Sequence, residues 1–209
     1  GFLDHPVVAV RQATIAALSA LNHPQTTKRA VPLLRDGEPY VREAAVKILG
    51  YIGQPDNLEL LLTCCHDPNN NVRQAAIENL PYFEGQEERV IPLLVAALES
   101  DTPKVRASAA RALADIDNNN VLTYLHHSAL KDTDAWVRYF AVRALGQRKA
   151  RDCWKTLTQI AQFDEANQVR IAAIEALGQV GEVQTVPILA RLSQVEEADL
   201  AHAALMALG

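Results

Sequence analysis

Apolar and small residues recur along the chain with a helical period, and the pattern itself repeats. The dipeptide Val-Arg occurs at positions 10–11, 41–42, 72–73, 105–106, 137–138 and 169–170, with spacings of 31, 31, 33, 32 and 32 residues. After each dipeptide the apolar residues return one and two helical turns later, as Val137, Ala141, Ala144 and Leu145 show. Such a spacing places them on one face of a helix. The sequence therefore predicts one amphipathic helix in each repeat.

A second, shorter apolar stretch precedes each of these helices, as at positions 58–62 and 90–95. Turn-forming residues separate the two stretches, for example Asp-Pro-Asn-Asn-Asn at positions 67–71, and they are typical of a loop followed by a helix start. We expect prolines 32, 92 and 187 to bend the first helix or to lie in its first turn. A glycine ends several copies of the second helix, and we expect Gly50, Gly146 and Gly178 to cap it.

Two short helices cannot bury their apolar faces alone, whereas stacked neighbours bury one continuous core. The sequence therefore predicts an all-α fold without strands, a right-handed α-solenoid of about six to seven helix-hairpin repeats. We expect a single repeat domain over residues 1–209. Because the chain starts at Gly1 and stops at Gly209 inside the pattern, a longer parent protein with further repeats remains an open expectation.

The repeated motif, for example Val-Arg-Ile-Ala-Ala-Ile-Glu-Ala-Leu-Gly at positions 169–178, resembles the HEAT-repeat superfamily. The short version of 31 to 33 residues resembles HEAT-like repeats of the phycobilisome-lyase type. In the HEAT family the loop aspartate and the helix arginine form a ladder between successive repeats. The resemblance therefore implies that the arginines of the Val-Arg dipeptides meet a set of loop aspartates, namely Asp36, Asp67, Asp101, Asp132 and Asp164.

Composition and charge narrow the possible functions. The chain has 20 basic and 25 acidic residues, a formal charge of -5 and a pI of about 5.7, which does not fit the basic footprint of a nucleic-acid-binding protein. No apolar run is long enough for a membrane span, and no secretory signal opens the chain. We therefore expect that the protein binds no nucleic acid and no membrane and that it is located in the cytoplasm.

The chain carries no motif for catalysis, metal binding or nucleotide binding. Its six histidines lack metal-ligand spacing, and no glycine-rich phosphate loop occurs. Cys64 and Cys65 are expected to be buried packing thiols rather than nucleophiles. We expect no catalytic residue, no metal and no cofactor, and no enzymatic activity unless the chain is a bilin lyase.

The resemblance implies that the second helices line the concave face of the solenoid, where residues between the core positions point outward; Ser108 is among these. The charged ones are of both signs, and the set comprises Lys47, Arg111 and Arg143 with Glu43, Glu78, Asp115 and Glu175. A mixed face offers no path for a phosphate backbone and suits a protein partner better.

Six of the eleven aromatic residues fall between positions 124 and 163. Tyr139 and Phe140 occupy positions that other copies fill with Gln, Glu or Ala, and such residues dominate binding energy at interfaces. Trp136 and Trp154 are expected to be packing residues. The predicted partner-binding residues are Tyr51, Tyr82, Arg111, Tyr139, Phe140, Arg143 and Gln147.

These observations favour a non-catalytic scaffold or adaptor that binds a protein or peptide on its concave face. The resemblance implies an alternative, a phycobilin lyase or pigment-chaperone subunit, which in that family often works with a second HEAT-like subunit. Arg111 and Arg143 would then hold the two propionates of the pigment, with Tyr139 and Phe140 against its rings. A regulatory array within a larger protein is a third possibility.

Overall fold

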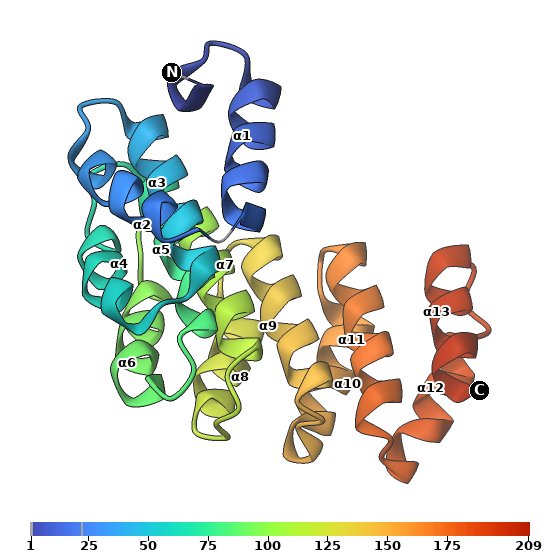
Figure 1. The fold of residues 1–209 in the computed structure, drawn as a ribbon. Helices are drawn as coiled ribbons and strands as arrows, with labels where there is room; N and C mark the ends of the chain where they lie inside the picture. The colour runs from blue at the N-terminus through green and yellow to red at the C-terminus, as the bar shows by residue number, and fades with distance from the viewer. Residues whose placement is uncertain (1, 22) are drawn as a thin grey trace. The chain divides into compact units, whose positions relative to one another are not determined.

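The regular elements of the described residues, 2–21 and 23–209, are all helices in the computed structural model (Figure 1). The prediction of an all-α fold is therefore confirmed. The helices gather into two compact units, Gly1–Ala97 and Leu98–Gly209, and each is described by itself below. The expectation of a single domain stays a prediction.

In the first unit the longer helices stack side by side, with α3 between α1 and α5. The segments α2 and η2 contact α3, and α4 contacts α5. Its α-helices are α1 (Val8–Leu21), α2 (Pro24–Ala30), α3 (Pro39–Ile52), α4 (Leu58–Cys64), α5 (Asn70–Asn79) and α6 (Glu87–Ala97). Its short 3-10 helices are η1 (Phe2–Asp4), η2 (Val31–Arg35), η3 (Pro55–Asn57) and η4 (Leu80–Tyr82).

In the second unit the second helices of successive repeats, α7, α9, α11 and α13, pack in that order, and the first helices α8, α10 and α12 pack on α9, α11 and α13 (Figure 1). The α-helices are α7 (Pro103–Ala114), α8 (Val121–Lys131), α9 (Ala135–Gln147), α10 (Trp154–Phe163), α11 (Asn167–Val180), α12 (Val186–Leu192) and α13 (Ala198–Leu208). Two 3-10 helices, η5 (Arg151–Cys153) and η6 (Val183–Thr185), lead into α10 and α12. This alternation is the predicted stack of helix hairpins.

Two of the three prolines in the first helices lie in a first turn, and the third lies inside its helix. Pro32 and Pro187 lie in the first turn of η2 and α12, where a missing N–H costs nothing. Pro92 lies inside α6. The first-turn placement is as predicted for Pro32 and Pro187, whereas a bend of α6 at Pro92 stays a prediction.

The core is built from the same repeat positions in the inner copies. The equivalent leucine is fully buried in five of them: Leu49, Leu113, Leu145 and Leu177 lie in second helices, and Leu80 directly follows α5. Alanines on the same helices, such as Ala76, Ala109, Ala141 and Ala173, are also fully buried. Because an alanine adds little bulk, neighbouring second helices approach closely and the leucines fill the seams between them.

The repeat glycines have a packing role, so the prediction that they cap the helices is wrong. Gly50, Gly146 and Gly178 lie inside α3, α9 and α11. A Cβ atom on Gly146 would stand 2.8 Å from the Cα and Cβ atoms of Ala176 in α11. The left-handed caps of α3 and α11 are Gly53 and Gly181, with φ of 60° and 68°.

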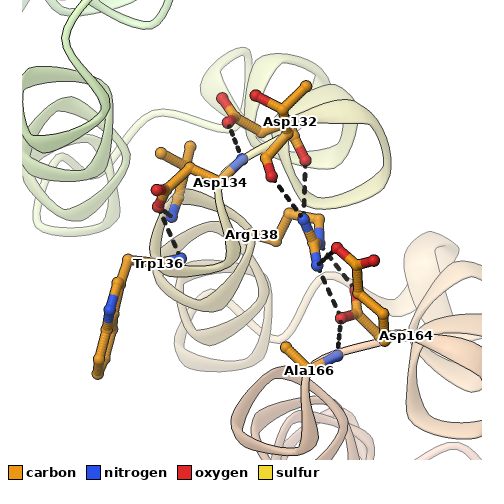
Figure 2. A network of polar contacts seen from close by, with 9 residues as sticks. Asp132, Asp134, Trp136, Arg138, Asp164 and Ala166 are labelled. Atoms are coloured by element: carbon orange, nitrogen blue, oxygen red, sulfur yellow. Dashed lines mark hydrogen bonds and ion pairs between the residues drawn. The ribbon is translucent and has the colours of Figure 1, made fainter.

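Within each unit, arginine guanidinium groups join successive repeats, as Figure 2 shows for Arg138. Its Nε and Nη2 atoms donate to the two carboxylate oxygens of Asp164 at 2.8 and 2.9 Å, and its Nη1 donates to the main-chain oxygen of Asp132 at 3.0 Å. The Asp164 carboxylate also accepts the N–H of Ala166 at 2.9 Å. Arg138 therefore ties the loop of its own repeat to the loop of the next one.

The same bidentate contact joins Arg42 to Asp67 and Arg106 to Asp132. The ladder implied by the family resemblance is thus confirmed for Asp67, Asp132 and Asp164.

At the other predicted positions the arrangement differs or is not described. The Asp36 carboxylate accepts the N–H of Glu38, while Arg11 lies over the Tyr40 ring at 5.0 Å. Asp101 belongs to the second unit and Arg73 to the first, so their pairing stays a prediction. In the last repeat the following loop offers a glutamate, and Arg170 lies 3.8 Å from Glu197.

Gly146→Ala should destabilise the second unit. The added Cβ would overlap the main chain of Ala176, and overpacking of this kind costs roughly 1–3 kcal/mol. An alanine inside a helix returns only about 1 kcal/mol, so the free energy of unfolding in urea should fall. Gly37→Ala is the control, because nothing lies within 4 Å of its Cβ position. Equal stability of the two variants would contradict the packing role.

Asp164→Asn should lower the free energy of unfolding by roughly 3 kcal/mol, because it leaves the buried guanidinium of Arg138 with only the exposed Glu165 as a counter-charge. The side chains of Arg138 and Asp164 are only 8% and 7% exposed. In contrast, Asp117 pairs with Arg148 but is 96% exposed, so Asp117→Asn should change stability little. Thermal unfolding of the two variants measures the difference. Equal losses of stability in both variants would show that burial of the Arg138–Asp164 pair does not contribute.

Stability should also fall steeply in acid because of the ladder. Burial raises the pKa of Asp67 and Asp132, but the arginine hydrogen bonds and a main-chain N–H outweigh it and leave each pKa below its ordinary value. The stability that these carboxylates contribute is present above their unfolded pKa of about 4 and is lost as pH falls through the lower folded pKa. Urea unfolding from neutral pH to about pH 2 should show a shallower loss for Asp132→Asn than for the wild type. Identical pH profiles for Asp132→Asn and the wild type would contradict a contribution of this carboxylate to the acid sensitivity.

Candidate partner-binding surface

Helix α9 carries a stripe of exposed and half-buried side chains, here named the α9 stripe: Trp136, Tyr139, Phe140, Arg143 and Gln147. Residues three, four and seven positions apart lie on one side of a helix, which brings these together. The helix begins where the Asp134 carboxylate accepts the N–H groups of Trp136 at 2.9 Å and Val137 at 3.3 Å (Figure 2). Arg138 of the same helix belongs to the ladder, so the helix that carries the stripe is tied to the next repeat.

The three rings of the stripe contact one another. The centroids of Tyr139 and Phe140 lie 5.3 Å apart, and those of Trp136 and Tyr139 lie 5.5 Å apart, both pairs in edge-to-face geometry. Trp136 and Phe140 are 6.3 Å apart and tilted by 33°. These are the arrangements that aromatic rings prefer, so the rings form a defined aromatic platform.

Two guanidinium groups flank this platform. Arg143 lies 5.7 Å from the Tyr139 centroid and donates to the Tyr139 hydroxyl at 3.4 Å, while Arg111 of α7 lies 5.9 Å from the Phe140 centroid. Asp115 lies near Arg111; burial raises the pKa of this carboxyl, and the charge of Arg111 opposes that rise. The α9 stripe therefore combines an aromatic surface with two neighbouring positive charges.

Trp136 is 55% exposed, so the prediction that it is a packing residue is wrong. The same repeat position holds the exposed Ala9, Asn71, Lys104 and Gln168 in four copies and the half-buried Tyr40 in one. The residues in most other copies therefore favour an exposed side chain at this position. Trp154, the other predicted packing residue, is half-buried, with Lys155 Nζ 5.6 Å from its ring.

Phe140 occupies a position that other copies fill with a small buried residue, namely Ala44, Ala75, Ser108 and Ala172. The prediction that Ser108 points outward is wrong, since it is only 5% exposed. This position faces the crowded seam between second helices. The larger Phe140 ring cannot be enclosed in the same way, and it is half-buried beside Arg111.

The other two predicted residues lie in the first unit. Tyr51 and Tyr82 are exposed and line a hollow of about 390 Å³, together with Gln12, Lys47 and Asn79. The structure thus brings Tyr51 and Tyr82 together, and it gathers Arg111, Tyr139, Phe140, Arg143 and Gln147 in the second unit. A binding role for all seven residues stays a prediction.

The cysteines are unsuited to nucleophilic chemistry. Burial raises the pKa of Cys64 to about 11 and that of Cys65 to about 12, which keeps both thiols protonated at neutral pH. In the described part of the chain, no three His, Cys, Asp or Glu side chains are grouped so as to hold a metal ion. Among the same residues, no helix combines the length and the apolar character that a membrane crossing requires.

The family model for HEAT repeats matches three overlapping segments, residues 2–81, 65–139 and 125–209. The matches span nearly the whole sequence, and the chain belongs to the HEAT-repeat family. No curated protein sequence matches the chain.

Solved structures with a similar fold include the CpcE–CpcF complex of phycocyanin lyase from Nostoc sp. PCC7120, at 19% identity and a TM-score of 0.57 over 99% of this chain and 84% of that one. The E. coli protein YibA is 18% identical, with a TM-score of 0.61 over 99% of this chain and 89% of that one. A mutant of Kap121p is 15% identical, with a TM-score of 0.75 over 95% of this chain but only 25% of that one. At such identities the likeness shows the fold alone.

Proposed function

We propose that the chain is a cytoplasmic, non-catalytic scaffold that binds a protein or peptide partner through the α9 stripe. The observation that carries this proposal is Trp136, which is more than half exposed and contacts the rings of Tyr139 and Phe140. Arg143 flanks the Tyr139 ring. Tryptophan, tyrosine and arginine are the residues that most often dominate the energy of protein interfaces.

The contacts that hold helix α9 in place also favour binding. The N-cap at Asp134 and the ladder contacts of Arg138 fix α9 at two points. Ring contacts and the Tyr139–Arg143 hydrogen bond restrict the side chains before any partner arrives. A partner would therefore meet a pre-organised surface, which lowers the entropy lost on binding.

A linear tetrapyrrole is a second candidate ligand for the same surface. Its two propionates would meet Arg111 and Arg143, and its planar rings would lie against Tyr139 and Phe140. An absorbance titration with phycocyanobilin tests this candidate. A saturating visible shift that Arg143→Gln weakens would favour a pigment-handling subunit, whereas a flat titration leaves the protein scaffold as the proposal.

The double variant Trp136→Ala, Tyr139→Ala should lose at least about tenfold in affinity for the partner, because two contacts of a hot spot cost more than 1.4 kcal/mol together. Its unfolding transition should stay close to that of the wild type, since neither ring lies in the fully buried core. Quantitative pull-down from cell extract, followed by titration of the captured protein, measures the loss. Phe163→Ala on α10 is the control, as it also removes an exposed ring. Undiminished capture by a well-folded double variant would refute the assignment.

A further inference from the structure

The charges around the α9 stripe indicate the chemistry of the partner. Arg143 donates to the Tyr139 hydroxyl and lies over its ring, and it makes no ion pair with a carboxylate within the described residues. Most arginines of the second unit differ in this respect, since Arg106, Arg138, Arg148, Arg151 and Arg170 each have an acidic partner. Arg143 is therefore a cation available for a bidentate contact with an incoming anion.

A basic side chain does not fit this surface. Aromatic faces attract cations in general, but here guanidinium groups already lie near the Tyr139 and Phe140 rings and repel a second positive charge. A nucleic acid fits poorly as well. Its phosphates need a row of cations, whereas Asp115 lies near Arg111 and exposed Glu175 occupies on α11 the repeat position of Arg143. The surface suits one carboxylate beside an apolar side chain.

Resting on the proposed function, we infer that the α9 stripe binds a linear peptide segment that carries an aromatic or leucine side chain and an acidic residue. The apolar side chain packs on Trp136 and Phe140, and the carboxylate accepts hydrogen bonds from Arg143. Trp136 and Arg143 are seven residues apart on the helix, which corresponds to ~10 Å along its axis. An extended peptide covers that distance in about three residues, which sets the spacing between its two anchoring side chains.

Selection from a displayed library of random peptides, about twelve residues long, tests this inference directly. The bait is the full chain as wild type, Trp136→Ala, Arg143→Gln or Lys155→Gln. The last is a matched control, because Lys155 is also an exposed cation over an aromatic ring but lies on α10. Wild type and Lys155→Gln should enrich peptides with Asp or Glu about three positions from Trp, Phe or Leu. Arg143→Gln should lose the acidic preference and keep the apolar one.

The outcomes separate this inference from the proposed function. Peptides that depend on Trp136 but lack an acidic preference would overturn the inference and leave the scaffold in place. Selection that is unaffected by Trp136→Ala would overturn both. Competition by single-stranded oligo-dT that Arg143→Gln abolishes would assign the surface to nucleic acid and overturn the peptide inference.

A synthetic copy of an enriched peptide then provides a double-mutant cycle. Replacing its acidic residue by the corresponding amide should weaken binding to the wild type by about tenfold, as expected for loss of a charge-assisted contact. The same replacement should change binding to Arg143→Gln by less than about twofold. Equal losses with both proteins would mean that the carboxylate does not contact Arg143, and would overturn the inference.

Discussion

Within each unit, buried arginine–aspartate contacts hold successive repeats together, and the rest of the structure depends on them. Arg42, Arg106 and Arg138 each bind the aspartate of the following loop with two hydrogen bonds. Arg138 and Asp164 are both buried, so their desolvation is compensated only while the pair stays intact. A hairpin of two short helices has too little core of its own and is stable only when packed on its neighbours. The arginine contact joins the loops of the hairpins that pack together.

The fold could be predicted from the sequence because the same helical pattern occurs in six copies, so that an irregular residue in one copy does not obscure the assignment. Six Val-Arg dipeptides at nearly constant spacing indicate the hairpins, and the buried leucines occupy the position that the helical period assigns to them. The role of Gly146 could not be read in the same way. A glycine near a helix end is consistent with either a cap or a close approach, and only the position of Ala176 distinguishes the two.

The candidate site was predictable in part for the same reason. Tyr139, Phe140, Arg143 and Arg111 depart from the residue types of other copies, and the structure places them together. Trp136 was missed because tryptophan is mostly buried on average, and because the same repeat position holds the half-buried Tyr40 as well as the exposed polar Asn71, Lys104 and Gln168. The stripe is thus a local exception on a regular scaffold, as expected where function rather than packing determines the residue.

We propose that a partner covers the α9 stripe, and site-specific photo-crosslinking in living cells tests this most directly. A photoreactive amino acid at position 147 lies at the edge of the stripe, whereas one at position 163 lies on α10. We expect a discrete adduct from position 147 that is absent from position 163 and that disappears when Trp136 is replaced by alanine. The same adducts from both positions, or an adduct that survives Trp136→Ala, would contradict the account.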